Sequence, residues 1–370
     1  MENRIFDLDM DIIALKFGIS GELVSFDKYG NGNINGTFIV EYENNSSTEK
    51  YILQKINTEV FKNPFELMKN IVGVTGHIRQ YYAGKGIDSS RRTLEFLKCD
   101  NGDYCFIDES GSCWRMYKYI DKAHTYDTID NADLFREAGR AFGEFQQILS
   151  TYDVSTLYDT IPDFHNTAKR FEAFKQAVNE NAVGRLQSVK NEVDFVLARE
   201  DDTHVLTDLI AEDKLPLRVT HNDTKINNIL FDEKTNEGIC VIDLDTVMTG
   251  LSLYDFGDCI RSGANKTAED DPNTDNVGID LELYEAFVSG YLSSAGEALT
   301  DTEKSYLPFS AKLLTFECGM RFLTDYLNGD TYFRIAYPEH NLDRCRNQFK
   351  LVEDMENNMD KMKAITNKYC

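Results

Sequence analysis

The sequence predicts an α+β fold, with a small antiparallel strand-rich part followed by a larger, mostly helical part. Strand-like segments around a Gly/Asn turn dominate the first third of the chain. Amphipathic helical patterns take over after residue 120. A polar loop, "VTHNDTKINNILFD" at 219–232, interrupts these helices. We therefore expect an amino-terminal lobe at 1–120 and a carboxyl-terminal lobe at 121–370.

The expected elements of the amino-terminal lobe alternate apolar runs with turn residues. Two strands are predicted within 22–43, around Gly and Asn residues, and a third at 50–57. Pro64 stands at the start of a helical pattern that runs to about residue 83. Three further strand candidates are the segments 92–99, 103–108 and 113–120.

The carboxyl-terminal lobe reads as a series of amphipathic helices with one strand-containing interruption. Short apolar runs flank the polar loop, and a further strand is predicted in "GICVIDLDTV". The helices are expected near 131–153, 167–178, 191–200, 253–263, 280–292, 305–327 and 341–370.

Composition excludes several classes of protein. The chain has 370 residues, 42% of them hydrophobic, with a formal net charge of -24, which argues against a nucleic acid or anionic membrane as partner. No apolar run reaches the roughly 18 residues of a membrane span, and the acidic start is unlike a secretory signal, so we expect a cytoplasmic protein. Eight cysteines without a CxxC pair predict reduced thiols.

The polar loop carries the residue types of a metal and phosphate site. A loop between strands can direct several neighbouring side chains at one point, so Asp223 and Asn228 can face one ligand. Asp243 follows the next apolar strand. Two carboxylates and an amide oxygen are hard donors suited to Mg²⁺, which takes the rest of its ligands from water and a nucleotide.

The spacing H-x-D-x-x-x-x-N, followed by an apolar strand ending in Asp, resembles the aminoglycoside-phosphotransferase superfamily. The longer runs "THNDTKINNILFD", "VIDLDTVMTGLSLYDFGD", "RSGAN", "IPDFHNT" and "RFLTDYLNGDTYF" together resemble bacterial N-acetylhexosamine 1-kinases. The resemblance covers most of the chain. It implies a protein-kinase-like two-lobe fold and the use of ATP and Mg²⁺.

The resemblance also implies roles for the loop. Asp223 would orient the acceptor hydroxyl and receive its proton, and Lys225 would meet the transferring phosphoryl group. Asn228 and Asp243 would hold Mg²⁺. Direct transfer needs cations around the phosphoryl oxygens and a positioned base.

Three further acidic or basic residues of these motifs have supporting or open roles. His221 is expected to support the loop by hydrogen bonds rather than act as the base. Asp255, in "YDFGD", is expected to tie down the catalytic loop. Asp245 is left open as either a second metal ligand or a hydrogen-bonding neighbour.

The nucleotide is expected to contact the amino-terminal lobe. Gly30 and Gly32 lie in the turn that would cover the phosphates, where a backbone without side chains allows close approach. Lys55, in the third strand, is the candidate for the phosphate-binding lysine, although its carboxylate partner is unclear. Backbone groups of Tyr119 and Ile120, between the lobes, would read the adenine edge.

The acceptor is expected to contact the segment 317–340. By resemblance to the hexosamine kinases, Arg321 and Tyr332 are the sugar-contact candidates, and Asn33 would reach the same pocket. The sequence therefore predicts an ATP-dependent kinase that phosphorylates the anomeric hydroxyl of N-acetylglucosamine or N-acetylgalactosamine. It predicts no oligomeric state.

Other functions remain open at this point. The acceptor can instead be choline, homoserine, methylthioribose or an aminoglycoside. "VIDLDTV" also fits the signature of haloacid-dehalogenase-type phosphatases, with Asp243 as nucleophile, which requires a following Rossmann-like domain. A third alternative is a binding protein on a degenerate kinase scaffold.

Overall fold

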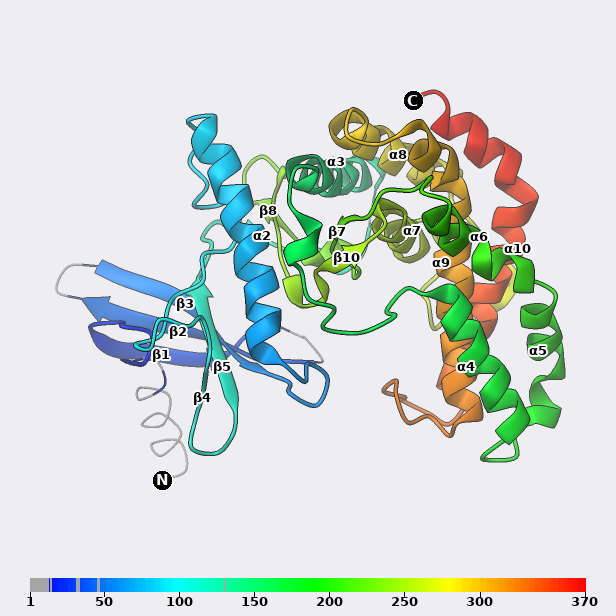
Figure 1. The fold of residues 1–370 in the computed structure, drawn as a ribbon, viewed down its shortest axis with the longest axis horizontal. Coiled ribbons are helices and arrows are strands. Elements are labelled where there is room, and N and C mark those ends of the chain that lie inside the picture. Colours follow the sequence, from blue (N-terminus) through cyan, green and yellow to red (C-terminus); the bar gives the residue numbers. More distant parts are fainter. Residues whose placement is uncertain (1–12, 14, 31–33, 45–46, 130) are drawn as a thin grey trace. The chain divides into compact units, whose positions relative to one another are not determined.

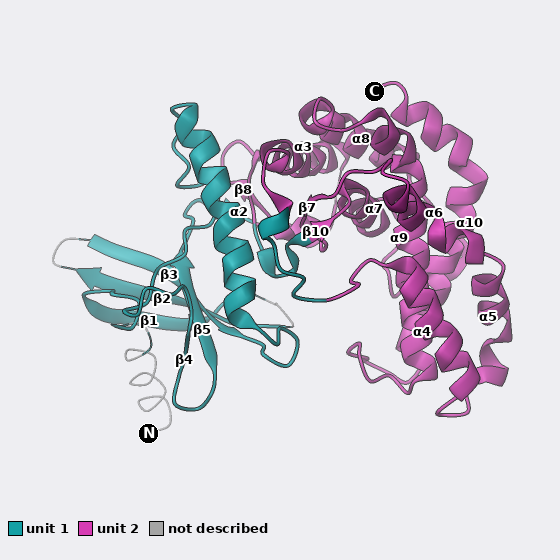
Figure 2. Ribbon diagram, viewed as in Figure 1, with its two compact units in different colours: residues 1–124, 155–161, 242–248 teal, residues 125–154, 162–241, 249–370 magenta. Residues whose placement is uncertain are grey.

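The computed structural model describes residues 13, 15–30, 34–44, 47–129 and 131–370 (Figure 1). The chain forms two compact units (Figure 2). Unit 1 contains Met1–His124, Ser155–Ile161 and Ile242–Met248, and unit 2 contains Thr125–Val154, Pro162–Val241 and Thr249–Cys370. Two later segments thus return to unit 1, and the expected boundary at residue 120 stays a prediction.

Unit 1 is built on an antiparallel sheet with the strand order β1-β2-β3-β5-β4 (Figure 1). The five strands are β1 (Glu22–Lys28), β2 (Gly36–Asn44), β3 (Ser47–Ile56), β4 (Phe106–Ile107) and β5 (Cys113–Lys118), and β6 (Ala123–His124) follows. Residues opposite one another in antiparallel strands share a face. Lys55 pairs with Trp114, and Gln54 pairs with Arg115, so these two pairs lie on opposite faces.

The expected strand at 92–99 is wrong. This segment forms a single bridge between Phe96 and Tyr117, with a hydrogen bond from the Leu97 N–H to the Met116 carbonyl oxygen. The reason is that the edge of β5 is shared. The short strand β4 pairs with Trp114 and Cys113, which leaves only part of the edge for this segment.

Helix α2 (Pro64–Gly84) begins where the sequence predicts, with the Asn63 side chain accepting a hydrogen bond from the Glu66 N–H. Its buried Asn70 joins the two returning segments to unit 1. The Asn70 side chain donates to the carbonyl oxygen of Val247 at 3.0 Å and accepts from the N–H of Tyr158 at 2.9 Å.

Unit 2 is mostly helical, as expected. Its helices are α3 (Ala132–Leu149), α4 (Thr167–Glu180), α5 (Lys190–Leu197), α6 (Glu200–Ala211), α7 (Ser252–Gly263), α8 (Leu281–Ala295), α9 (Asp301–Leu327) and α10 (His340–Thr366). The α+β prediction is therefore confirmed. No Rossmann-like domain follows Asp258 in the described chain, so the requirement of the phosphatase alternative is not met.

Short strands carry the polar loop of unit 2. Strand β7 (Arg218–Thr220) precedes the loop, and β8 (Ile229–Asp232) and β9 (Gly238–Val241) form a hairpin after it; β10 (Met248–Gly250) comes next. Ile229 pairs with Val241. Asn228 therefore precedes the paired residue Ile229 by one position, and Asp243 follows the paired residue Val241 by two positions.

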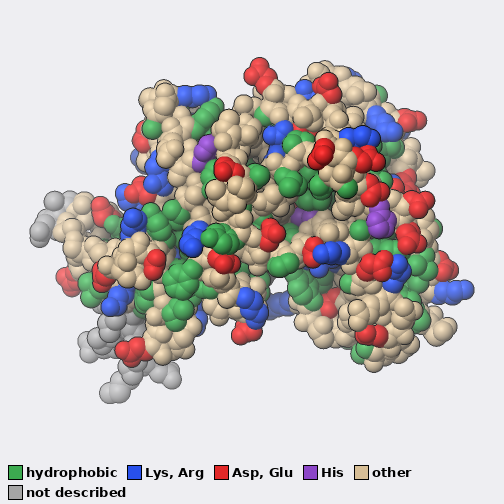
Figure 3. All heavy atoms as spheres, in the orientation of Figure 1, with side chains coloured by type: hydrophobic (Ala, Val, Ile, Leu, Met, Phe, Trp, Pro, Cys, Tyr) green, Lys and Arg blue, Asp and Glu red, His purple; other side chains and the backbone are tan. Residues whose placement is uncertain are grey.

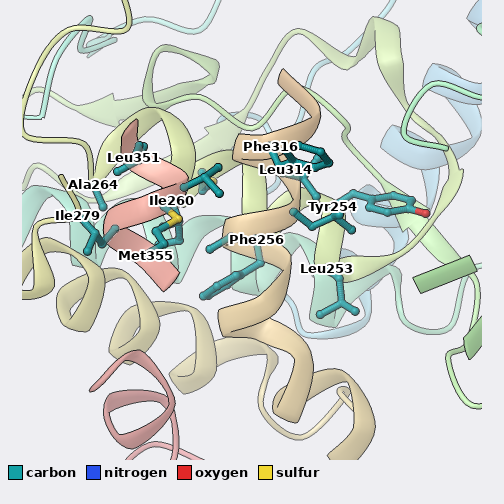
Figure 4. Close-up of a cluster of buried hydrophobic side chains, with 14 of the residues drawn as sticks. Leu253, Tyr254, Phe256, Ile260, Ala264, Ile279, Leu314, Phe316, Leu351 and Met355 are labelled. Atoms are coloured by element: carbon teal, nitrogen blue, oxygen red, sulfur yellow. The ribbon is translucent and has the colours of Figure 1, made fainter. Parts of the chain in front are cut away.

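The core of unit 2 forms around α7, whose side chains are buried on nearly all sides. In Figure 4, Ile260 of α7 lies near labelled side chains of α9 and α10, and Phe256 belongs to the same buried cluster. Gly257 lets α7 approach α9 closely, because a Cβ there would lie 2.5 Å from the Ser310 carbonyl oxygen. The helix is thereby held firmly against the rest of the unit.

Helices α3 and α8 also meet through glycines. A Cβ at Gly139 would lie 2.4 Å from the carbonyl oxygen of Phe287, and one at Gly143 would lie 2.5 Å from that of Tyr291. In the other direction, a Cβ at Gly290 would lie 1.9 Å from the carbonyl oxygen of Arg136. The two backbones are therefore in direct contact.

The surface carries charges of both signs. On the face shown in Figure 3, acidic side chains are scattered among basic ones and do not gather into one patch. Across the described residues, none of the helices combines the length and the apolar character that a membrane span requires.

Candidate active site

The backbone of the polar loop is held by two carboxylates of α7. Asp255 accepts from the N–H of His221 at 2.9 Å and from the N–H of Asn222 at 2.8 Å. Asp258 accepts from the N–H of Thr224 at 3.0 Å. Because an unpaired buried N–H is costly, these contacts fix the loop conformation.

Asp255 has further contacts that make it the centre of this support. Its side chain accepts from Gln146 at 2.8 Å, and its backbone carbonyl accepts from the Thr224 hydroxyl at 2.6 Å. Burial raises the pKa of Asp255 above its ordinary value, and the N–H donors of the loop oppose that rise. The carboxyl group is fully engaged by the loop and by α3.

Asp258 forms a buried pair with Arg261 of the "RSGAN" motif. Arg261 donates to Asp258 from Nε at 2.9 Å and from Nη2 at 2.8 Å, and it also pairs with Glu269. Burial acts to raise the pKa of Asp258, but Arg261 and then Lys225 outweigh burial and hold that pKa below its ordinary value. Asp258 is therefore an anion under the loop.

The structure brings Asp223, Lys225 and Asn228 together at the tip of the loop. The Lys225 ammonium lies 2.8 Å from Asp223 Oδ1, and the Asn228 amide donates to the Asp223 carbonyl oxygen at 2.7 Å. The negative charge of Asp223, opposed by burial, raises the pKa of Lys225 above its ordinary value. The side chains of Asp223 and Lys225 are 34% and 44% exposed, so the pair is accessible to a ligand.

The residues before Asp223 are constrained. Asn222 has a φ of 65°, a left-handed conformation that asparagine tolerates better than most residues. His221 is fully buried, and its ring meets Phe142 and Phe145 edge-on. Its Nδ1 accepts from the Asp223 N–H at 3.3 Å. His221 thus contacts the backbone of the loop.

Asp243 and Asp245 belong to unit 1 and differ in environment. Asp243 is exposed and has a φ of 57° at the start of a short 3-10 helix, Leu244–Thr246. Asp245 is buried, and its two oxygens contact Arg115 and Asn35. Asp245 is therefore a hydrogen-bonding neighbour of Arg115, and Asp243 has the more accessible carboxylate.

Arg115 is a buried cation of unit 1. It is 2% exposed and donates from Nε to Gln54 at 2.9 Å, in addition to its pair with Asp245. Lys55 lies on the opposite face of the sheet, exposed, with its ammonium 5.9 Å from the Trp114 ring centroid. Gln54, and not Lys55, shares the face with Arg115 and Asp245.

The remaining nucleotide candidates have mixed outcomes. Gly30 has a φ of 72°, where glycine is favoured, and Gly32 lies outside the described residues. The Tyr119 N–H donates to the Lys50 carbonyl oxygen at 3.0 Å, so it is used within the sheet. Ile120 is buried. Their adenine-binding role stays a prediction.

The acceptor candidates lie on α9 and the loop after it. The Arg321 guanidinium carbon is 5.7 Å from the ring centroid of Phe164, 5.8 Å from that of Tyr332 and 5.5 Å from that of Phe333. Tyr332 is 68% exposed. Asp325 fixes this loop by accepting from three successive N–H groups, those of residues 331–333. Asn33 lies outside the described residues.

Sequence reasoning missed the residues that act through long-range contacts: Arg115, Gln146, Asp258 and His165. Arg115 gave a weak signal as an arginine inside an apolar strand. His165 gave a stronger one, because it lies in "IPDFHNT", a motif to which no chemistry was assigned. In the structure His165 contacts both Glu317 and Asn222.

The two predicted metal ligands, Asn228 of unit 2 and Asp243 of unit 1, each have an oxygen suited to a hard cation. The Asn228 amide nitrogen is used by Asp223, so its oxygen is the atom suited to a cation. Asp243 adds an exposed carboxylate. Over the residues whose placement is described, no cluster of three or more His, Cys, Asp and Glu side chains could enclose a metal. Mg²⁺ is the cation that binds through one or two carboxylates and a nucleotide.

Comparison with known proteins places this geometry in context. The profile of a family described as the phosphotransferase enzyme family matches residues 28–296. The curated protein "Probable choline kinase 1" of Arabidopsis thaliana is 28% identical over 122 residues, 31% of this chain and 34% of that protein. The chain therefore matches about a third of that relative's length.

Solved structures share the fold over nearly the whole chain. The microcompartment-associated aminopropanol kinase has a TM-score of 0.57 and 15% identity, covering 96% of this chain and 98% of that one. An aminoglycoside phosphotransferase from Alicyclobacillus acidocaldarius has a TM-score of 0.60 and 10% identity, covering 97% and 96%. Choline kinase from Cryptosporidium parvum has a TM-score of 0.52 and 14% identity, covering 97% and 99%. The kinase-like fold prediction is confirmed.

Proposed function

This chain belongs to the phosphotransferase enzyme family, and from that premise we propose that it phosphorylates the anomeric hydroxyl of an N-acetylhexosamine with ATP. The motifs that resemble hexosamine 1-kinases support this acceptor. N-acetylglucosamine and N-acetylgalactosamine are both candidates. We retain the expectation that the protein works in the cytoplasm.

The observation that best supports this acceptor class is the group of aromatic rings around Arg321. A sugar needs donors for its hydroxyl and acetamido oxygens and an apolar wall for its ring faces. The Arg321 guanidinium offers donors, and Phe164, Tyr332 and Phe333 offer rings. These residues belong to unit 2, which also contains the Asp223 loop.

An amino alcohol such as choline is the second candidate acceptor. The partial match to a choline kinase favours it. A cationic acceptor, however, requires an acidic or aromatic pocket, and here a guanidinium already lies among the rings. Arg170 adds a second positive charge. Burial lowers the pKa of Arg170, and the nearby charge of Arg321 lowers it further. The local charge therefore favours a neutral sugar.

The proposed chemistry is a direct in-line transfer. The anomeric oxygen attacks the γ-phosphorus of ATP, the bond to the β–γ bridging oxygen breaks, ADP leaves, and the hydroxyl proton goes to Asp223. Lys225, which its contact with Asp223 keeps protonated, is proposed to meet the phosphoryl oxygens. Asn228 and Asp243 are the proposed ligands of Mg²⁺, which when bound would neutralise phosphate charge.

A panel of acceptors tests this function. Purified protein is incubated with ATP, Mg²⁺ and N-acetylglucosamine, N-acetylgalactosamine, glucose, choline, homoserine, methylthioribose or an aminoglycoside, and ADP release is measured. Phosphorus NMR then identifies the phosphorylated position. We expect a sugar 1-phosphate from an N-acetylhexosamine. A 6-phosphate product would refute the regiochemistry, and turnover of choline alone would refute the acceptor class.

Replacing Arg321 by Gln tests the acceptor contact. A hydrogen bond from a charged donor contributes about 1.5–3 kcal/mol, so we expect the KM for the sugar to rise roughly 10- to 100-fold. The KM for ATP should stay unchanged. Arg334→Gln is the matched control, because Arg334 is an exposed arginine of the same loop region. Equal sugar KM values in the two variants would contradict the contact.

A pair of variants compares the buried Arg115 with Lys55, the residue predicted to bind phosphate. Arg115→Lys keeps a charge but loses the fork that holds Asp245 and Gln54, so we expect the KM for ATP to rise about 10-fold. Lys55→Met should change it by less than about threefold, since Lys55 lies over Trp114 on the other face. The reverse order of effects would restore Lys55 as the phosphate-binding residue.

A further inference from the structure

His165 links two parts of unit 2 that are distant in sequence. It lies just before α4 and is buried. Its Nδ1 is 2.8 Å from Glu317 Oε1 on α9, and its Nε2 is 3.2 Å from the carbonyl oxygen of Asn222 in the catalytic loop. A single imidazole thus bridges helix α9 and the residue that precedes Asp223.

Both partners of this ring are hydrogen-bond acceptors. A backbone carbonyl can only accept, and an ionised carboxylate can only accept. Burial acts to raise the pKa of Glu317, but His165, and after it Arg321 and Thr167, outweigh burial and keep that pKa below its ordinary value. The second oxygen of Glu317 accepts from the Thr167 hydroxyl at 2.6 Å. Glu317 is therefore a carboxylate with both oxygens engaged.

A neutral imidazole has one N–H and can satisfy only one of the two acceptors. The geometry therefore requires hydrogens on both ring nitrogens. With a neutral ring, the N–H would stay on the carboxylate side and a nitrogen lone pair would face the Asn222 carbonyl oxygen. That contact would be repulsive.

We propose that His165, as an imidazolium, is a positioning residue that fixes the catalytic loop to helix α9. Asp255 accepts from the N–H of Asn222, and His165 contacts its carbonyl oxygen. The left-handed backbone conformation of Asn222 is thus fixed at both of its polar groups. Asp223 follows directly. The inference rests on the proposed function, in which Asp223 is the base.

The position of Glu317 connects the His165 link to the proposed acceptor contact. Arg321, the proposed acceptor contact, lies four residues after Glu317 on α9, and Phe164, beside His165, is one of the rings around Arg321. The same short segment thus contacts the acceptor arginine and, through His165, the catalytic loop. The imidazolium sets where the base stands relative to the acceptor.

Charged and titratable groups surround the ring on several elements. Glu317 on α9 and Asp258 on α7 are negative charges near the ring, and Arg170 on α4 and Arg321 on α9 are positive charges near Glu317. The Tyr254 ring of α7 lies 5.3 Å from the imidazole. A ring with only one hydrogen should release Asn222 and lower kcat.

Glu317→Gln is the diagnostic variant. An amide at position 317 can donate to Nδ1 and still accept from Thr167, so a neutral ring keeps its hydrogen on Nε2 and its bond to Asn222. We expect the pH profile of kcat to differ between the unaltered protein and Glu317→Gln, because only in the unaltered protein does the bond to Asn222 need a second ring hydrogen. Identical pH profiles of kcat would overturn the proposal.

His165→Phe removes both donors while keeping a ring. We expect kcat to fall roughly 10- to 100-fold with the KM for ATP unchanged, because the nucleotide side is not touched. A kcat within about threefold of the unaltered protein would overturn the proposal. Glu317→Gln retains every hydrogen bond, so it keeps the test valid should the His165→Phe protein fail to fold.

Nitrogen NMR of histidine-labelled protein provides a readout that needs no activity. The chain has six histidines, and His165→Phe assigns the signals of His165. We expect hydrogens on both ring nitrogens at neutral pH, and on Nε2 alone in Glu317→Gln. A neutral His165 in the unaltered protein would overturn its role as a positioning residue. An inactive protein with a charged His165 would overturn only the proposed function.

Discussion

Replacing Asp223 by Asn is expected to lower kcat by about 10²- to 10⁴-fold while ATP binding survives. The amide has nearly the same shape, so the loop should keep its fold. It cannot accept the hydroxyl proton, and it removes the charge that Lys225 contacts at 2.8 Å. The loss should therefore affect turnover and not nucleotide affinity.

Initial rates at saturating sugar and ATP measure the effect, and calorimetric titration of ATP with Mg²⁺ measures binding. Asp213→Asn is the matched control, because Asp213 is exposed and has a φ of 55°, which asparagine also accepts. Its kcat should equal that of the unaltered protein. A kcat for Asp223→Asn within threefold of normal would remove the assigned base.

Replacing Asp255 by Ala is expected to reduce the free energy of unfolding by roughly 3–5 kcal/mol and to abolish most activity. Three donors lose their acceptor: the N–H groups of His221 and Asn222 and the amide of Gln146. Each buried donor left unsatisfied costs about 1–3 kcal/mol, and local relaxation recovers part of the sum. The loop that presents Asp223 should lose its fixed conformation.

Urea unfolding followed by circular dichroism measures this loss of stability. Glu233→Ala, at an exposed turn position, is the control and should change the free energy by no more than about 0.5 kcal/mol. Asp255→Asn should fall between the two, because its one amide oxygen replaces two carboxylate oxygens. An Asp255→Ala protein as stable as the control would show that the loop does not depend on α7.

Periodicity was sufficient to predict most elements of the fold. Apolar residues at helical spacing marked the long helices of unit 2, and Pro64 marked the start of α2. The segment 92–99 misled because its apolar pattern fits a strand, while pairing depends on which neighbour occupies the edge of β5. Local pattern carries no information about that competition.

The same limit applies to the candidate site: contacts between neighbours in sequence were predictable, and contacts between distant residues were not. Asp223, Lys225 and Asn228 are close in sequence, so their spacing was informative, and the structure brings them together. The partner of Asp245 lies 130 residues away at Arg115, and the partner of His165 lies 152 residues away at Glu317. Such pairs arise from the tertiary fold, and a single sequence does not indicate which distant residues will meet.

The direct contact of α3 and α8 through Gly139, Gly143 and Gly290 has a consequence for motion. Helices ordinarily slide past each other by small rotamer changes in the side chains between them. Here no side chain separates the backbones at these points, so no rotamer change can accommodate such sliding. The α3–α8 pair should therefore translate and rotate as one solid piece during turnover, and its amide hydrogens should exchange with solvent among the slowest in the protein.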